Sequence, residues 1–241
     1  MRISRIFANT PFVSGQQVRL EGQVAHYLGK VLRLTQGNAL TLFNGDGLEY
    51  SASIEAVAKH HVDVMIGASQ QPGTESPLNT LLGLGISRGE RMDYAIQKST
   101  ELGVSRIAPL FTTHCEVRLN AERQDKRVEH WQQIAISACE QSGRVKVPEI
   151  LAPMSLADFV QQCNEQVKLV FDLDEAASLS GPRPSGGVAL LIGPEGGLAP
   201  EEINLAREAG FQGVRLGPRV LRTETAPVAA LAVLQHVWGN N

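Results

Sequence analysis

The chain has 241 residues, of which 43% are hydrophobic and 20% charged, and its formal net charge is −3. This composition is typical of a soluble globular protein with one large domain or two small ones, and it argues against disorder and against a generally basic nucleic-acid binder. No apolar run reaches the ~18 residues of a membrane span, and the first residues lack the apolar core of a signal peptide.

The cysteines indicate the compartment. Cys115, Cys139 and Cys163 are odd in number and lack the spacing of metal ligands or of a CxxC motif. Thiols without a pattern are typical of a reducing cytoplasm, so we expect a cytoplasmic protein without a metal site. His114 precedes Cys115, but the sequence places no second group to activate this thiol, and an inert cysteine is the better interpretation.

Short runs with β character predominate in the first part of the chain. They lie at 39–44, 48–57 and 61–67. The turn NGDG at 44–47 predicts a hairpin between the first two, and one helix is expected over 22–34. Together they predict a small β-barrel domain at 1–72. The Gly/Pro/Ser-rich segment 69–77 predicts a linker.

Strands and helices alternate in the rest of the chain, 73–241. Buried strands are expected at 78–86, 105–111, 167–173, 187–193 and 213–217. Helices are expected at 88–103, 120–142, 199–210 and 226–238, with Gly103 and Gly210 just after two of their ends. This alternation, with continuous apolar strands, predicts a second, α/β domain built on a parallel sheet.

Two glycine-containing loops follow strands of this predicted sheet. The first is GPEGG at 193–197, and the second, at 217–225, contains two arginines, two threonines and a glutamate. Ligands of open α/β sheets bind outside the carboxyl ends of strands, and glycines let the backbone approach a ligand closely. The loops therefore predict one composite pocket, against the alternative of two unrelated surface turns.

A third glycine-rich stretch does not predict cofactor binding. LGLGISRGE at 82–90 has its glycines at 83, 85 and 89, a G-x-G-x-x-x-G spacing that fails the dinucleotide fingerprint. We interpret it as the end of a strand with a tight turn.

Basic residues lie close together in the first domain, although the net charge of the whole chain is negative. His26, Lys30 and Arg33 are spaced i, i+4, i+7 on the expected helix, and Arg2 and Arg5 lie near the start. A local basic patch can bind phosphates, whereas three charges on a helix are commonly a solvated face. Both interpretations stay open for this stripe.

The last predicted helix, 226–238, is apolar on nearly all sides. Such a helix must be buried beyond its own domain's face, which predicts a second subunit against it. Thr225 directly before it is a candidate N-cap.

These motifs resemble those of a known family. LLIGPEGGLAPEEI at 190–203 and LGPRVLRTETA at 216–226 are similar to the RsmE-type 16S rRNA (uracil-N3) methyltransferases of the SPOUT superfamily. The likeness continues in QKSTELGV at 97–104, ACEQSGR at 138–144, H…KVLR at 26–33 and RIF at 5–7, so it spans nearly the whole chain in order. Pro227 departs from the family pattern, but in the first turn of a helix its missing N–H costs little.

The resemblance implies an N-terminal PUA-like β-barrel and a C-terminal α/β domain with a trefoil knot. It implies S-adenosylmethionine as cofactor, a homodimer, and a uridine near the decoding centre of the small ribosomal subunit as substrate. Carried over, it implies that the cofactor is bound by Leu191, Ile192, Gly193, Pro194, Glu195, Gly196, Gly197, Leu216, Gly217, Val220, Leu221, Arg222, Thr223 and Thr225.

Methylation at N3 of uracil needs positioning and a way to remove the N3 proton. Arg222 is the first candidate, because a cation would stabilise negative charge developing on O2 or O4. Glu195 or Glu224 could accept the proton, although Glu224 could also serve only the electrostatics of a helix terminus. Arg2, Arg5, His26, Lys30 and Arg33 are the candidates for binding RNA.

Three other functions remain as rivals. The chain could be a non-catalytic RNA-binding protein, or a methyltransferase of the same superfamily that acts on tRNA or on 2′-hydroxyls. A nucleotide-dependent oxidoreductase is disfavoured by the failed glycine spacing.

Overall fold

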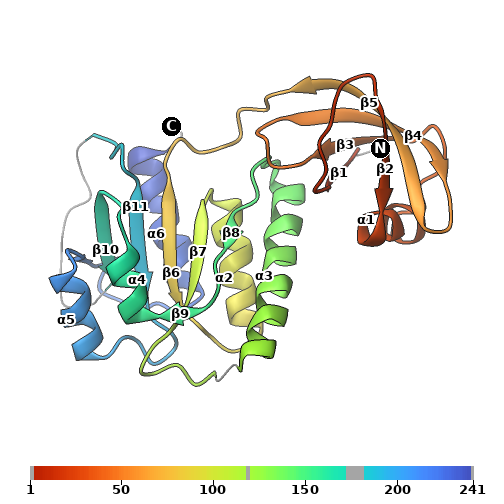
Figure 1. The fold of residues 1–241 in the computed structure, drawn as a ribbon. Coiled ribbons are helices and arrows are strands. Elements are labelled where there is room, and N and C mark those ends of the chain that lie inside the picture. Colours follow the sequence, from red (N-terminus) through yellow and green to blue (C-terminus); the bar gives the residue numbers. More distant parts are fainter. Residues whose placement is uncertain (1–2, 118–119, 172–181, 240–241) are drawn as a thin grey trace. The chain divides into compact units, whose positions relative to one another are not determined.

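The computed structural model describes residues 3–117, 120–171 and 182–239 (Figure 1). The chain forms two compact units. One consists of Met1–Glu75 together with Cys139–Val147, and the other of Ser76–Ala138 together with Pro148–Asn241.

The N-terminal unit is built on a five-stranded sheet with the order β1-β3-β4-β5-β2. Its strands are β1 (Ser4–Phe7), β2 (Gln17–Glu21), β3 (Ala39–Phe43), β4 (Glu49–Val57) and β5 (His61–Gln70). β3 and β4 pair antiparallel across the predicted turn, so the hairpin is confirmed. The core lies under the sheet and includes Leu28, Leu40, Leu42, Ile54, Val62 and Val64.

The predicted helix over 22–34 is shorter and less regular than expected. An α-helix, α1 (Gly22–His26), passes into a π-helical turn, η1 (Tyr27–Val31), and Arg33 beyond it has a left-handed φ of 52°. A residue with positive φ cannot continue a helix. His26, Lys30 and Arg33 are all exposed, but the prediction that they form a stripe on one regular helix is wrong.

A segment distant in sequence completes this unit. Arg5 donates to the carbonyl of Cys139 at 3.0 Å, and the Phe7 amide donates to the Glu140 carboxylate at 3.0 Å. Glu75, inside the predicted linker, accepts hydrogen bonds from the Val145 amide at 2.8 Å and from Arg144 at 2.9 Å. These bonds explain why 139–147 belongs with the first 75 residues.

The C-terminal unit is built on a parallel sheet. Its order is β12-β10-β11-β6-β7-β8, with β9 also paired to β7. The strands are β6 (Thr80–Gly85), β7 (Arg106–Phe111), β8 (Glu149–Ile150), β9 (Met154–Ser155), β10 (Val167–Phe171), β11 (Val188–Ile192) and β12 (Gln212–Val214). Every pair in this sheet is parallel, as the alternating pattern predicted.

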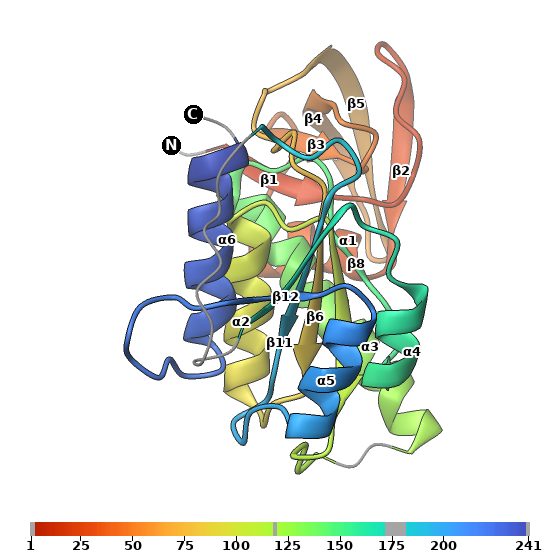
Figure 2. The same ribbon diagram turned by 90° about the vertical axis from the view of Figure 1, so that its left-hand side faces the viewer.

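Helices cover both faces of that sheet. They are α2 (Glu90–Glu101), α3 (Ala121–Ser142), α4 (Leu156–Gln162), α5 (Pro200–Glu208) and α6 (Thr225–Trp238). α2 and α6 lie side by side on one face, while α4 and α5 pack on the other around Phe159 and Phe211 (Figure 2). Gly103 and Gly210 end α2 and α5 with φ near 90°, as expected.

Candidate functional site

The two predicted loops meet at the carboxyl edge of the parallel sheet. They leave β11 and β12 and enclose a pocket of about 570 Å³, here called the inner pocket. Its lining is Arg91, Phe171, Ile192, Gly193, Pro194, Glu195, Gly197, Leu198, Ile203, Val214, Leu216, Arg219, Val220, Leu221, Arg222, Thr223, Glu224 and Ala226. The apolar wall and charged rim suit a ligand that is flat and uncharged at one end and charged at the other.

Thr223 joins the loops of the inner pocket. Its hydroxyl donates to the carbonyl of Gly193 at 3.0 Å and lies 3.1 Å from the hydroxyl of Ser87, which follows β6. Both side chains are buried. One buried threonine thus links three loops around the inner pocket.

Gly85 explains the glycine-rich stretch that failed the dinucleotide pattern. A Cβ on Gly85 would overlap the backbone nitrogen and Cδ of Pro194. Only glycine therefore lets the Gly193–Pro194 backbone lie against the end of β6. The tight-turn interpretation was incomplete, because this glycine also supports the inner pocket.

Glu195 is held ionised at the rim. Its Oε1 accepts hydrogen bonds from the Arg88 amide at 3.1 Å and from the Arg91 guanidinium at 3.0 Å. Partial burial disfavours the charge, but the hydrogen bonds from backbone amides and from Arg91 outweigh it, and the pKa of Glu195 is lowered. A carboxylate with a lowered pKa is a weak proton acceptor, which counts against Glu195 as a general base.

Glu224 has a different environment. It is the N-cap of α6 but makes no side-chain capping bond, so the expectation that Thr225 caps this helix is wrong. Its Oε1 is 3.9 Å from Arg222, whose side chain is 80% exposed. Its Oε2 is buried and has no hydrogen-bond partner among the described residues. A buried carboxylate oxygen without a donor is costly, so this atom is suited to a cationic ligand group.

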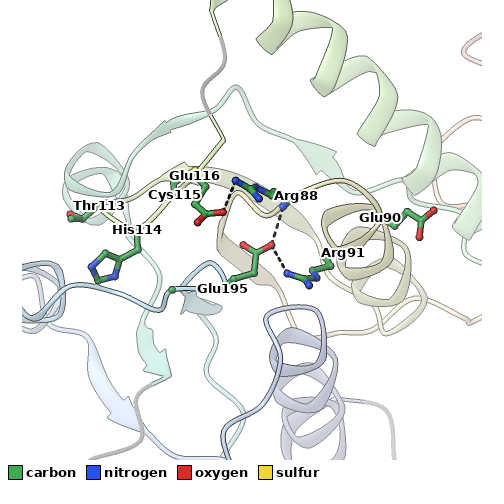
Figure 3. Close-up of a pocket in the computed structure, with 9 residues that line it drawn as sticks. Arg88, Glu90, Arg91, Thr113, His114, Cys115, Glu116 and Glu195 are labelled. Atoms are coloured by element: carbon green, nitrogen blue, oxygen red, sulfur yellow. Dashed lines mark hydrogen bonds and ion pairs between the residues drawn. The ribbon is translucent and has the colours of Figure 1, made fainter.

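A second pocket, here called the outer pocket, adjoins the inner one. It has a volume of about 880 Å³ and shares Arg91 and Glu195 with the inner pocket. Figure 3 shows Glu195 between Arg88 and Arg91, with Thr113 and His114 across the pocket. The lining is Arg88, Glu90, Arg91, Thr113, His114, Cys115, Glu116, Glu195 and Gly196.

Most residues expected to bind a cofactor line the inner pocket. Four do not. Leu191 is fully buried in the sheet, and Gly217 and Thr225 are outside the lining. Gly196 lines the outer pocket instead, where a Cβ would lie 2.8 Å from the Cβ of His114.

Several lining residues had no signal of their own in the sequence. Phe171 and Val214 are ends of strands, and Arg91 lies in the first turn of α2. Only the strand order brings them to the loops already identified. Phe171 and Val214 lie inside the predicted strands at 167–173 and 213–217, so a search of the residues that follow each predicted strand would have missed them.

The residues expected to bind RNA have different surroundings. Arg2 lies outside the described residues. Arg5 forms an ion pair with Glu49 at 3.0 Å and lies over the ring of Phe43, with its side chain only 17% exposed. Because its guanidinium has these partners inside the unit, the geometry counts against the predicted contact of Arg5 with phosphate.

The cysteines differ in access. Burial raises the pKa of the Cys139 and Cys163 thiols to about 12, so both are inert. Cys115 is only partly buried, and its Sγ donates to the carbonyls of Ile86 and Val117.

The described part of the chain has neither a candidate membrane span nor a cluster of metal ligands. None of its helices combines the length and the apolar character needed to cross a bilayer. Nor do its His, Cys, Asp and Glu side chains form a group of three or more that could hold a metal ion.

Two family models match the chain. Residues 74–235 match the RNA methyltransferase domain, and residues 20–66 match the RNA methyltransferase PUA domain. These matches show that the chain is an RNA methyltransferase with an N-terminal PUA domain.

Individual relatives narrow the class. The chain is 36% identical over 241 residues to ribosomal RNA small subunit methyltransferase E of Buchnera aphidicola subsp. Schizaphis graminum, covering 99% of this chain and 98% of the relative. A Legionella pneumophila protein solved with the bound cofactor SAM is 43% identical with a TM-score of 0.94, and covers 100% of both chains. Ribosomal RNA small subunit methyltransferase E from Neisseria gonorrhoeae, bound to S-adenosyl methionine, is 40% identical with a TM-score of 0.92 over 99% of both chains. The chain belongs to the ribosomal RNA small subunit methyltransferase E family.

Proposed function

We propose that the protein transfers the methyl group of S-adenosylmethionine to N3 of a specific uridine in the decoding region of 16S rRNA. The observation that carries the proposal is the inner pocket, built by the two loops that follow β11 and β12. The structural relatives of 43% and 40% identity that hold S-adenosylmethionine support the cofactor.

The residues of the inner pocket fit this cofactor. Phe171, Ile192, Leu198, Val214 and Leu216 are apolar and would cover the flat adenine. The buried Oε2 of Glu224, which lacks a described partner, would accept a hydrogen bond from the α-ammonium group. When bound, the cofactor supplies an electrophilic methyl group on a sulfonium.

Arg222 is the residue to which we assign the chemistry. The N3–H bond of uracil must break, and its electron pair then spreads over O2 and O4. A guanidinium beside either oxygen stabilises this anion and lowers the pKa of N3–H, so water suffices to take the proton. The exposed Arg222 side chain at the rim is free to reach a nucleobase.

The glutamates then have other tasks. Glu195, ionised and bonded to Arg91, acts as a positioning residue that fixes the wall between the two pockets. Glu224 binds the cationic end of the cofactor. Neither is required to carry the proton.

The N-terminal unit, which contains the domain proposed at 1–72, would contact RNA through its exposed cations. Lys30 and Arg33 follow one another along an irregular turn, with Tyr27 and Val31 also exposed beside them. Phosphate contacts by exposed cations give affinity without sequence preference. The choice of nucleotide then rests with the C-terminal domain, proposed at 73–241.

We also propose that the active species is a homodimer through α6 and that the loops at 193–197 and 217–225 form the trefoil knot of the superfamily. Val233 on α6 is 37% exposed, and Val220 on the second loop is 80% exposed. Apolar side chains left in water on a helix and on its preceding loop favour a covering partner.

The decisive experiment is the mapping of methylated nucleotides in ribosomal RNA from a strain lacking the gene. The expected result is the loss of one N3-methyluridine, restored by the wild-type protein and not by Arg222→Ala. Loss of a tRNA or 2′-O-methyl mark would favour the other methyltransferases. Unchanged RNA together with no heat of binding to S-adenosylmethionine would favour a non-catalytic RNA-binding protein.

A further inference from the structure

The outer pocket is lined mainly by charged and polar residues, and it adjoins the wall of the inner pocket. Arg91 and Glu195 line both pockets, so the two share one ion pair as a partition (Figure 3). A group that is to receive a methyl from the inner pocket must come within ~3–3.5 Å of it. The outer pocket is therefore placed to hold an acceptor.

Arg88 is the cation of this pocket that can change partner. Its guanidinium pairs with Glu116 at 2.8 Å, and the two side chains are 68% and 66% exposed. An ion pair in such exposure is worth only ~0–1 kcal/mol, so a competing anion can replace the carboxylate. The backbone of Arg88 stays fixed meanwhile, because its amide donates to Glu195.

Arg91 is a contrasting case. Its guanidinium bonds the same Glu195 oxygen that the Arg88 amide holds, and Glu195 is less exposed than Glu116. A carboxylate held by several donors does not release one of them readily. Arg91 thus belongs to the wall, and Arg88 is available to a ligand.

We propose that the outer pocket is a nucleotide subsite for an RNA strand, in which Arg88 exchanges Glu116 for a backbone phosphate. This inference deepens the proposed function, since it assigns the place where the acceptor nucleotide enters. Guanidinium groups bind phosphate through two parallel hydrogen bonds, which fixes the strand's position as well as its affinity. Glu116 then acts as a competitor that occupies Arg88 until RNA arrives.

The charge variants give opposite predictions. Binding of a fluorescent single-stranded uridine-rich RNA is measured by anisotropy over a range of salt. Arg88→Ala should lower the affinity about five-fold and reduce the salt slope by about 0.7, the value for one phosphate of a single strand. Glu116→Gln should raise the affinity at least about two-fold, because it removes the competing anion.

A matched pair controls for net charge. Lys126 and Glu122 on α3 form an ion pair of similar exposure in the same unit, at 71% and 77%. Lys126→Ala and Glu122→Gln should leave the affinity nearly unchanged. An Arg88→Ala protein that behaves like Lys126→Ala would overturn the proposal, as would a Glu116→Gln protein that loses affinity.

Cys115 provides an independent measure of occupancy. It lines the outer pocket and is partly exposed, whereas Cys139 and Cys163 are buried. Saturating RNA should slow alkylation of Cys115 by iodoacetamide at least about ten-fold, measured by mass spectrometry of the peptide. Unchanged alkylation with RNA fully bound would mean that the pocket stays open and would reject the subsite.

These measurements need no methyl transfer. If the N3-methyluridine assignment fails, Arg88 dependence and Cys115 protection are still expected with RNA. If they fail while the methylated nucleotide is mapped as proposed, the function stands and the acceptor enters elsewhere.

Discussion

Glu224→Gln tests how the inner pocket holds its cofactor. The substitution keeps the shape of the side chain and removes its charge. In the free protein, Oε2 of Glu224 is buried without a described partner at the start of α6. In the complex, we propose that this oxygen accepts a hydrogen bond from the α-ammonium of S-adenosylmethionine.

The magnitudes give opposite signs for stability and binding. An unpaired buried polar atom costs ~1–3 kcal/mol, while a carboxylate at a helix N-terminus gains only ~0.3–1 kcal/mol. Glutamine still buries an unpaired polar atom, but a neutral atom costs less to bury than a charged one, so removing the charge should slightly stabilise the free protein. A hydrogen bond to a charged group is worth ~1.5–3 kcal/mol, so the affinity for S-adenosylmethionine should fall about 10- to 100-fold.

Calorimetric titration with three ligands separates the possible partners. S-adenosylhomocysteine keeps the ammonium but lacks the sulfonium, and 5′-methylthioadenosine lacks the whole amino-acid end. Glu224→Gln should lower the affinities for S-adenosylmethionine and S-adenosylhomocysteine equally, and it should leave the affinity for 5′-methylthioadenosine unchanged. A loss confined to S-adenosylmethionine would assign Glu224 to the sulfonium and refute the reasoning, and an equal loss for all three would indicate a distorted pocket and refute it too.

Glu201→Gln is the matched control. Glu201 is an exposed carboxylate in the first turn of α5, so it shares the helix-terminus electrostatics but lies outside the inner pocket. The Glu201→Gln protein should lose ~0.3–1 kcal/mol of stability and keep its affinity for S-adenosylmethionine.

Three further predictions concern assembly, RNA and acid stability. Val233→Glu on α6 should yield a folded monomer by analytical ultracentrifugation, and a wild-type monomer at micromolar concentration would reject the dimer. Leu231 is unsuited to this test, because it is fully buried within the chain's own core and Leu231→Glu should unfold the protein. The double variant Lys30→Ala and Arg33→Ala should weaken RNA binding and reduce the salt slope of that binding by about 1.4, while calorimetry shows an unchanged affinity for the cofactor. An unchanged salt slope would mean that the turn carrying Lys30 and Arg33 is a solvated surface that does not contact RNA. Burial opposes the charge of Glu75, but hydrogen bonds from an arginine and two amides lower its pKa below the ordinary 4.5. Its contribution to stability is therefore complete above about pH 4.5 and is lost as the pH falls through the folded-state pKa. Glu75→Gln should cost ~1–3 kcal/mol of stability at pH 7 and flatten the acid limb of the curve of stability against pH, and an unchanged acid limb would contradict this linkage.

Local patterns predicted the elements that depend on near neighbours. The hairpin at 44–47 follows from its turn residues, and the ends of α2 and α5 follow from Gly103 and Gly210. Three short elements between 149 and 162 were not predicted. β8, β9 and α4 contain too few residues to show a period, although Ser155 caps α4 through the Asp158 amide as a sequence signal would suggest.

Long-range contacts give some residues surroundings that the sequence did not predict. Arg5 looked like a phosphate ligand because it is basic and near the start, but Glu49 and the segment from Cys139 surround its guanidinium. Charge is visible in a sequence, whereas a partner 44 or 134 positions away is not. The same holds for Leu231, whose apolar character predicted burial without saying by which partner.

The sequence by itself determined three features: the change from short β runs to alternating strands and helices, the parallel character of the second sheet, and the two loops of the inner pocket. These features could be predicted because periodicity, turn residues and glycines act over a few positions. Only the tertiary structure decided which loops meet. The strand order puts β6 beside β11, so that Ser87 and Thr223 lie 3.1 Å apart although 136 residues separate them. It also brought Arg88 and Arg91 to Glu195, and thereby created the wall between the inner and outer pockets. Such contacts depend on the packing of whole strands and helices, which no short window of sequence specifies.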